Sequence, residues 1–145
     1  MHHHPAVAVE PLKTRNALYG GRTEAMRLHH KINDNETIEY CDVMSLYPFI
    51  CKTFKFPVGH PAIHVAPQDA ASILFKEGIL KCKILPPSSL YHSVLPARIN
   101  GRLIFCSCRK CAEIENQNNC THNREERSST GTWIIDEVRK AVIPF

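Results

Sequence analysis

The chain has 145 residues, enough for one domain with a hydrophobic core. Hydrophobic residues make up 43% and charged residues 22%, as in an ordinary globular protein. No apolar run approaches the ~20 residues of a membrane span, so we expect no membrane partner. The net charge of +4 permits an anionic partner such as nucleic acid without requiring one.

The first third of the chain alternates loops and short elements. Residues 1–11 are predicted to be a loose lead-in, and the pair Gly20-Gly21 to be a permissive backbone site. Residues 23–28 suit a strand or a short helix. Residues 31–37 are polar and rich in Asn and Asp, which predicts a turn, and residues 37–43 alternate as in a strand.

Two helices and a strand are expected next. Pro48 suits a first helical turn, which predicts a helix over residues 49–55. The apolar spacing of residues 67–76 predicts a second helix. Residues 78–85 alternate apolar and lysine side chains, which is typical of a half-exposed strand.

The last third carries a hairpin signal. Asn100-Gly101 is predicted to be the two-residue turn of a hairpin over residues 97–105. A strand over 132–135 and a helix over 137–142, with Asp136 as its N-cap, follow a Cys-rich loop. Together the elements predict an α+β fold with a mixed or antiparallel sheet, flanking helices and a Cys-rich hairpin loop.

The segment Asp42-Val43-Met44-Ser45-Leu46-Tyr47-Pro48 carries the clearest chemistry. A carboxylate at a strand end, followed by a tight turn, can direct a hard oxygen ligand at Mg²⁺ and offer backbone groups to a triphosphate. The alternative is that Asp42 only caps a turn and Tyr47 packs in a core, as holds for most short D-x-x-S matches.

This segment resembles motif A of family B DNA polymerases, D-x-x-S-L-Y-P. Residues 18–24 (LYGGRTE) resemble the glycine-pair loop of the protein-primed branch, and residues 56–61 (FPVGHP) resemble the loop after motif A. Gly131-Thr132-Trp133 with Glu137-Val138 resembles a later strand-helix step. The resemblance spans residues 12–142, so we expect a lead-in at 1–11 and a partial palm domain over 12–145, with a zinc loop at 104–124.

The resemblance implies a DNA-directed DNA polymerase that extends a DNA primer with dNTPs during DNA replication. Its implied partners are primer-template DNA, dNTPs and a terminal priming protein, in the nucleus or at a viral replication site. Asp42 would ligate two magnesium ions, and Tyr47 would exclude a 2′-hydroxyl. The further implied contacts are Val43 (backbone, to Mg²⁺), Ser45 and Leu46 (nucleotide), and Gly20, Gly21 and Arg22 (template DNA). One departure is Leu18, which stands where the family often has an aromatic residue; Tyr19 is an alternative source of that ring.

A two-metal site needs a second carboxylate group. The family supplies it from a D-T-D motif, and neither D-T-D nor K-x-x-x-N-S-x-Y-G occurs in this sequence. We therefore expect the chain to be an incomplete polymerase that is inactive by itself. The alternatives are an inactive, zinc-stabilised nucleic-acid-binding remnant and a zinc-ribbon interaction domain in which motif A is accidental.

Four of the seven cysteines lie between residues 106 and 120. An odd, clustered set of cysteines favours an intracellular metal site over a disulfide framework. The pattern C-x2-C followed by C-x-H suits tetrahedral zinc, with Cys108, Cys111, Cys120 and His122 as the predicted ligands and Cys106 as a substitute. Free thiols in a polar loop are the alternative. Nearby basic residues offer contacts to a nucleic-acid backbone: Arg109, Lys110, Arg124 and Arg127.

Overall fold

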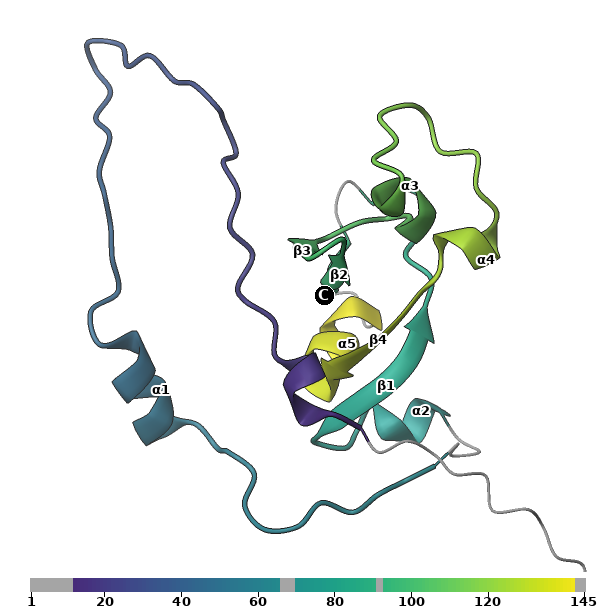
Figure 1. Cartoon of the computed structure of the whole chain (residues 1–145). Helices are drawn as coiled ribbons and strands as arrows, with labels where there is room; N and C mark the ends of the chain where they lie inside the picture. Colours follow the sequence, from purple (N-terminus) through teal and green to yellow (C-terminus); the bar gives the residue numbers. More distant parts are fainter. Residues whose placement is uncertain (1–11, 66–69, 91–92, 143–145) are drawn as a thin grey trace, which may run out of the picture. The chain divides into compact units, whose positions relative to one another are not determined.

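The computed structural model describes residues 12–65, 70–90 and 93–142, and the chain divides into two units. The first unit takes in residues up to Gly20 and from Ala66 onward, and the second is Gly21–Val65. Figure 1 shows the elements of both units in sequence colours. The lead-in predicted for residues 1–11 lies outside the described residues.

The first unit is built from short helices and two antiparallel strand pairs, which confirms the predicted α+β class. One pair is β1–β4 and the other is β2–β3 (Figure 1). In chain order its elements are η1 (Thr14–Ala17), α2 (Ala70–Ile73), β1 (Ile79–Ile84), β2 (Ala97–Ile99), β3 (Arg102–Ile104), α3 (Arg109–Glu113), α4 (Arg124–Arg127), β4 (Ser129–Ile134) and α5 (Ile135–Val142).

Strand β1 confirms the alternation expected over residues 78–85. Lys81 and Lys83 are exposed, whereas the apolar positions between them are partly buried. Its partner β4 places Leu80 opposite Trp133. Trp133 is fully buried, and its indole N–H donates a 2.8 Å hydrogen bond to the carbonyl oxygen of Pro96. The core therefore forms around Trp133, with Leu95 and Val138 beside it.

The β2–β3 hairpin turns where the sequence predicts. Asn100 has φ 50° and Gly101 has φ 76°, so both central residues lie in the left-handed region that a type I′ turn requires. Asn tolerates this conformation better than most residues because its side chain is short and polar. The side-chain amide of Asn100 donates a hydrogen bond to the carbonyl oxygen of Glu113, at 3.1 Å. The turn thereby ties the hairpin to the end of α3.

Several predicted boundaries are wrong by a few residues. Strand β4 begins at Ser129 rather than at 132, because β1 offers partners along its whole length. Helix α5 begins at Ile135, so Asp136 lies in its first turn and is not the N-cap. Its carboxylate there still opposes the positive helix end. Of the helix predicted over 67–76, residues 67–69 lie outside the description, Ala70–Ile73 are helical, and residues 74–76 are not helical.

The second unit contains one helix, α1 (Leu46–Thr53), which begins earlier and ends earlier than the predicted 49–55. The turn expected in residues 31–37 is present, with the Glu36 N–H donating to the Asn33 carbonyl oxygen at 3.0 Å. The strand predicted over 37–43 is wrong for this structure, and residues 23–28 form neither strand nor helix. A strand requires a hydrogen-bonded neighbour, and within the described residues segment 37–43 has none.

Candidate functional site

The cysteine cluster is set up by the start of helix α3. Cys108 is the N-cap residue of this helix, with extended backbone dihedrals, and its Sγ accepts the N–H of Cys111 at 3.4 Å. The three-residue spacing of C-x2-C places both sulfurs on the same side of the first helical turn. The N-cap position of Cys108 therefore both starts helix α3 and places its sulfur near that of Cys111.

The chain returns to these sulfurs through Cys120 and His122. The Nδ1 atom of His122 lies 3.6 Å from the Sγ of Cys108, 3.2 Å from the Sγ of Cys111 and 3.7 Å from the Sγ of Cys120. The four ligand atoms all lie within 4.8 Å of one another. The structure therefore brings together the four residues that the sequence spacing selects, and Cys106 is not in this group.

These distances fit a tetrahedral zinc ion. With Zn–S of about 2.3 Å and Zn–N of about 2.0 Å, a tetrahedron places sulfur and nitrogen about 3.5 Å apart. The observed separations of 3.2–3.7 Å span that value. Three thiolates and one imidazole also match the soft donor set of closed, structural zinc sites.

The electrostatics of the cluster differ from one ligand to the next. Burial raises the pKa of Cys108 to about 11. Hydrogen bonds from the His122 backbone and ring are the main reason that the pKa of Cys120 falls to about 7. The side-chain amide of Asn116 donates to the Sγ of Cys111 at 3.5 Å. A cation bound by the cluster would favour the thiolate form of Cys108, which burial disfavours.

The segment after the ligands is anchored to β1. Asn123 and Glu126 form a reciprocal capping box that starts α4 directly after His122. Lys83 of β1 forms an ion pair with Glu125, and the Arg127 guanidinium donates to the Pro86 carbonyl oxygen at 2.7 Å. The ligand loop is thus closed at both ends by regular structure.

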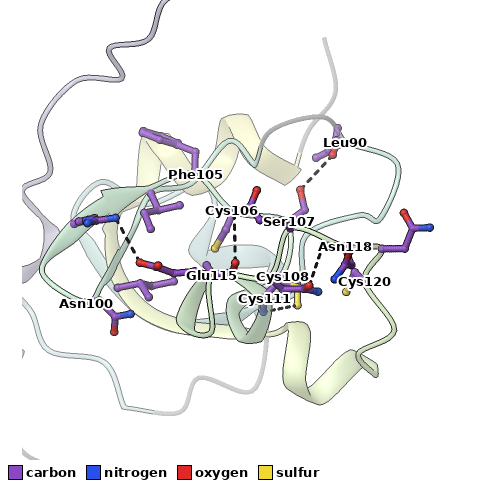
Figure 2. Close-up of a pocket in the computed structure, with 17 residues that line it drawn as sticks. Leu90, Asn100, Phe105, Cys106, Ser107, Cys108, Cys111, Glu115, Asn118 and Cys120 are labelled. Carbon is purple, nitrogen blue, oxygen red and sulfur yellow. Dashed lines mark hydrogen bonds and ion pairs between the residues drawn. The ribbon is translucent and has the colours of Figure 1, made fainter.

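Figure 2 shows the hollow beside this cluster, which has a volume of about 1030 Å³. Cys106, Cys108, Cys111 and Cys120 line it together with Asn118 and other residues of the β3–α3 and 115–120 segments. Burial raises the pKa of the Cys106 thiol. Cys106 therefore forms part of the wall as a neutral thiol.

The basic residues predicted to surround the cluster are mostly engaged within the chain. Arg109 pairs with Glu113 at 2.7 Å, and Lys110 lies 4.0 Å from the same carboxylate. Arg127 is bound to a backbone carbonyl. Arg109 and Lys110 share one carboxylate, and Arg127 bonds a carbonyl oxygen within the chain. A nucleic-acid contact at this face therefore stays a prediction.

The carboxylate motif lies in the second unit. Asp42 is exposed, and no hydrogen bond or ion pair joins its side chain to another residue in the described parts of the chain. Ser45 follows with φ 58° and ψ 30°, a left-handed conformation at the N-cap of α1. Leu46 and Tyr47 are the first two helical residues, and the Tyr47 side chain is 82% exposed. Ser45 is strained in this conformation, as residues at functional turns often are.

The residues before the glycine pair belong to the first unit. Tyr19 packs against the Trp133 core, so its ring is held there. The Arg98 guanidinium carbon lies 4.9 Å from the centre of that ring, and Arg98 donates to the Leu18 carbonyl oxygen at 2.8 Å. The sequence carried no signal for Arg98, because a contact over 80 positions leaves no local pattern.

In the second unit, Arg22 forms a two-point contact with Glu24, at 3.1 Å and 2.6 Å. The guanidinium fork that binds a carboxylate in this way has the same geometry toward a phosphate. The ion pair is exposed, and such pairs stabilise by only about 0–1 kcal/mol.

The structure and motifs define an α+β polypeptide with a Cys₃His cluster and a motif-A-like carboxylate turn. The family model for type B DNA polymerases, organellar and viral, matches residues 12–132. Since this match covers most of the 145 residues, the chain belongs to the organellar and viral type B DNA polymerase family. Comparisons with curated proteins and with solved structures each gave no match. Among the described helices, none has the length and apolarity to cross a membrane.

Proposed function

We propose that this chain contributes to DNA-directed DNA polymerisation, in which a primer end is extended with dNTPs on a DNA template. Asp42 is the metal-binding carboxylate, and the backbone of Val43, Ser45 and Leu46 meets the metal and the triphosphate. Tyr47 stands beside the sugar and excludes a 2′-hydroxyl. Gly20, Gly21 and Arg22 contact the template DNA.

One observation supports the proposal above the rest. The family match includes the whole string from Asp42 to Pro48, and the left-handed Ser45 lies at its centre. The abrupt turn at Ser45 starts a helix whose first two residues are Leu46 and Tyr47. Backbone N–H groups at the start of a helix have no partner within the helix, so they are free to bind phosphate oxygens.

The residues for magnesium are only half present in this chain. Mg²⁺ would offset charge on the triphosphate and activate the attacking primer hydroxyl. The sequence supplies Asp42 and the Val43 carbonyl but has no D-T-D motif. No second carboxylate of the proposed site is therefore assigned to a residue of this chain.

We also propose that the Cys₃His cluster holds a structural Zn²⁺. All four positions of a tetrahedron are filled by protein ligands, which leaves no site for substrate. The ion fixes the loop between β3 and β4, and zinc has no place in the nucleotide chemistry. Its role is to stabilise the fold.

The test is an Asp42→Ala substitution in a full-length polymerase that carries this chain. Primer extension with Mg²⁺ and dNTPs is expected to fall by more than about 10³-fold, because one of the carboxylates holding the ions is lost. Asp34→Ala is the matched control, since Asp34 is an exposed carboxylate in the turn of the same unit. Equal activity of the two variants would contradict the proposal and favour a nucleic-acid-binding protein without catalysis.

A further inference from the structure

One guanidinium joins the β2–β3 hairpin to the residues that lead into the glycine pair. Arg98 lies on β2 (Ala97–Ile99), and its fork donates to the Leu18 carbonyl oxygen at 2.8 Å. The same group covers the ring of Tyr19, at 4.9 Å from the ring centre. Two consecutive residues are thus held by one side chain from a distant strand.

The hairpin also contacts the first glycine. A Cβ at Gly20 would lie 3.8 Å from the Cδ2 of Leu103 on β3. Tyr19 also packs against the Trp133 core, and Ala17 is fully buried. The hairpin and the core therefore fix the backbone up to Gly20, the first residue of the glycine pair.

We propose that Arg98 is a positioning residue for template DNA binding, which holds residues 18–20 at the start of the glycine-pair loop without touching the DNA. This inference rests on the proposed contact between Gly20–Arg22 and the template. A loop that is already ordered loses less conformational entropy when DNA binds, so the affinity is higher. This positioning role requires arginine, because a planar guanidinium can hydrogen-bond a carbonyl oxygen and stack on an aromatic ring at the same time.

The rival role for Arg98 is a direct contact to a phosphate, and the salt dependence of binding separates the two. A cation that neutralises one phosphate contributes about one to the slope of log K against log salt. A positioning residue changes the affinity and leaves this slope unaltered. Lysine would replace arginine in a phosphate contact but not in the clamp on Leu18 and Tyr19.

The experiment measures the Kd for primer-template DNA across a salt series in the full-length polymerase. Arg98→Ala and Arg98→Lys are each expected to weaken binding about tenfold, the size expected for a lost charge-assisted hydrogen bond. The salt slope and the KM for dNTP are expected to stay unchanged. Arg102→Ala on the neighbouring strand is the control, since Arg102 forms an exposed ion pair with Glu115, at 3.5 Å; its Kd should match the unmodified protein.

Three outcomes would overturn the inference. They are unchanged binding in both Arg98 variants, a salt slope lowered by about one in Arg98→Ala, and full rescue by Arg98→Lys. If Arg98→Ala does not fold, Arg98→Lys carries the same test, since it keeps the aliphatic stem and the charge. If Asp42→Ala abolishes extension while the Arg98 variants bind normally, only the inference fails. If the unmodified protein shows no salt-dependent DNA binding, both the inference and the DNA contact beneath it fail.

Discussion

The chain has two candidate metal sites, the Cys₃His cluster and the motif-A turn. One short stretch of sequence contains all four ligands of the first site but only one proposed carboxylate ligand of the second. The Cys₃His cluster draws its four candidate ligands from fifteen consecutive residues, Cys108–His122, and their atoms converge. The motif-A turn offers Asp42 on an exposed segment without partner strands in the described part of the chain. The locally encoded Cys₃His cluster converges in this structure, whereas the proposed polymerase site requires groups besides Asp42.

A large loss of zinc binding should follow from breaking the locally encoded site. Cys108→Ser removes the buried ligand, and we expect zinc affinity to fall by more than about 100-fold because a closed site depends on all four donors. Zinc content and hydrogen exchange of residues 104–124 measure the loss. Cys41→Ser, at an exposed cysteine of the second unit, is the control; an equal loss there would show that the cluster is not the zinc site.

The role proposed for Tyr47 should be visible in the choice between deoxynucleotides and ribonucleotides. Tyr47→Ala in the full-length polymerase is expected to lower discrimination against ribonucleotides by about 10²-fold, because the steric barrier to a 2′-hydroxyl is removed. The ratio of kcat/KM for dNTP and rNTP measures this change. Tyr40→Ala, which removes another exposed ring in the same unit, should leave the ratio unchanged. Unaltered discrimination in Tyr47→Ala would remove its assigned role.

The sheet of the first unit can be weakened without touching either site. In Gly131→Ala the new Cβ would lie 2.6 Å from the Cζ2 and Cη2 atoms of Trp133, which is too close for either side chain. We expect the free energy of unfolding to fall by about 1–3 kcal/mol. Denaturant unfolding of this variant beside Thr130→Ala, an exposed neighbour on β4, checks it; equal stability would mean that the ring moves aside freely.

The smallest effect concerns Glu137 on α5. Burial raises the pKa of this carboxyl, and its Oε2 atom is buried without a hydrogen-bond partner. A raised pKa means that the folded state loses stability as pH rises through that pKa. Glu137→Gln should therefore be slightly more stable than the unmodified chain at pH 7, and the gain should shrink as pH falls toward 4.5. A stability gain that does not change with pH would show that the charge on the buried carboxylate is not its cause.

The sequence predicted the local features well. The alternation of lysines in β1 and the Asn100-Gly101 turn involve neighbours only, and both are confirmed. The cysteine spacing selected the residues that converge. Apolar and polar residues alternate equally well in segment 37–43, yet it forms no strand here. Alternation indicates which face of a strand is apolar, but a strand also needs a neighbouring strand to pair with.

Long-range contacts could not be predicted from the sequence. Arg98 reaches Leu18 across 80 positions, and Trp133 bonds the Pro96 carbonyl across 37. No periodicity or motif connects such pairs, since their proximity depends on the whole topology. The family resemblance added the identity of Asp42 and Tyr47 as candidate site residues, which composition and spacing alone left undecided.

Metal stoichiometry of the 145-residue chain tests the contrast between the two sites most directly. Elemental analysis with calorimetric titration should find one tightly held zinc per chain, and no saturable Mg²⁺ binding that depends on Asp42. A chain without zinc, or one that binds Mg²⁺ through Asp42 by itself, would contradict the account of one complete site and one half-built site.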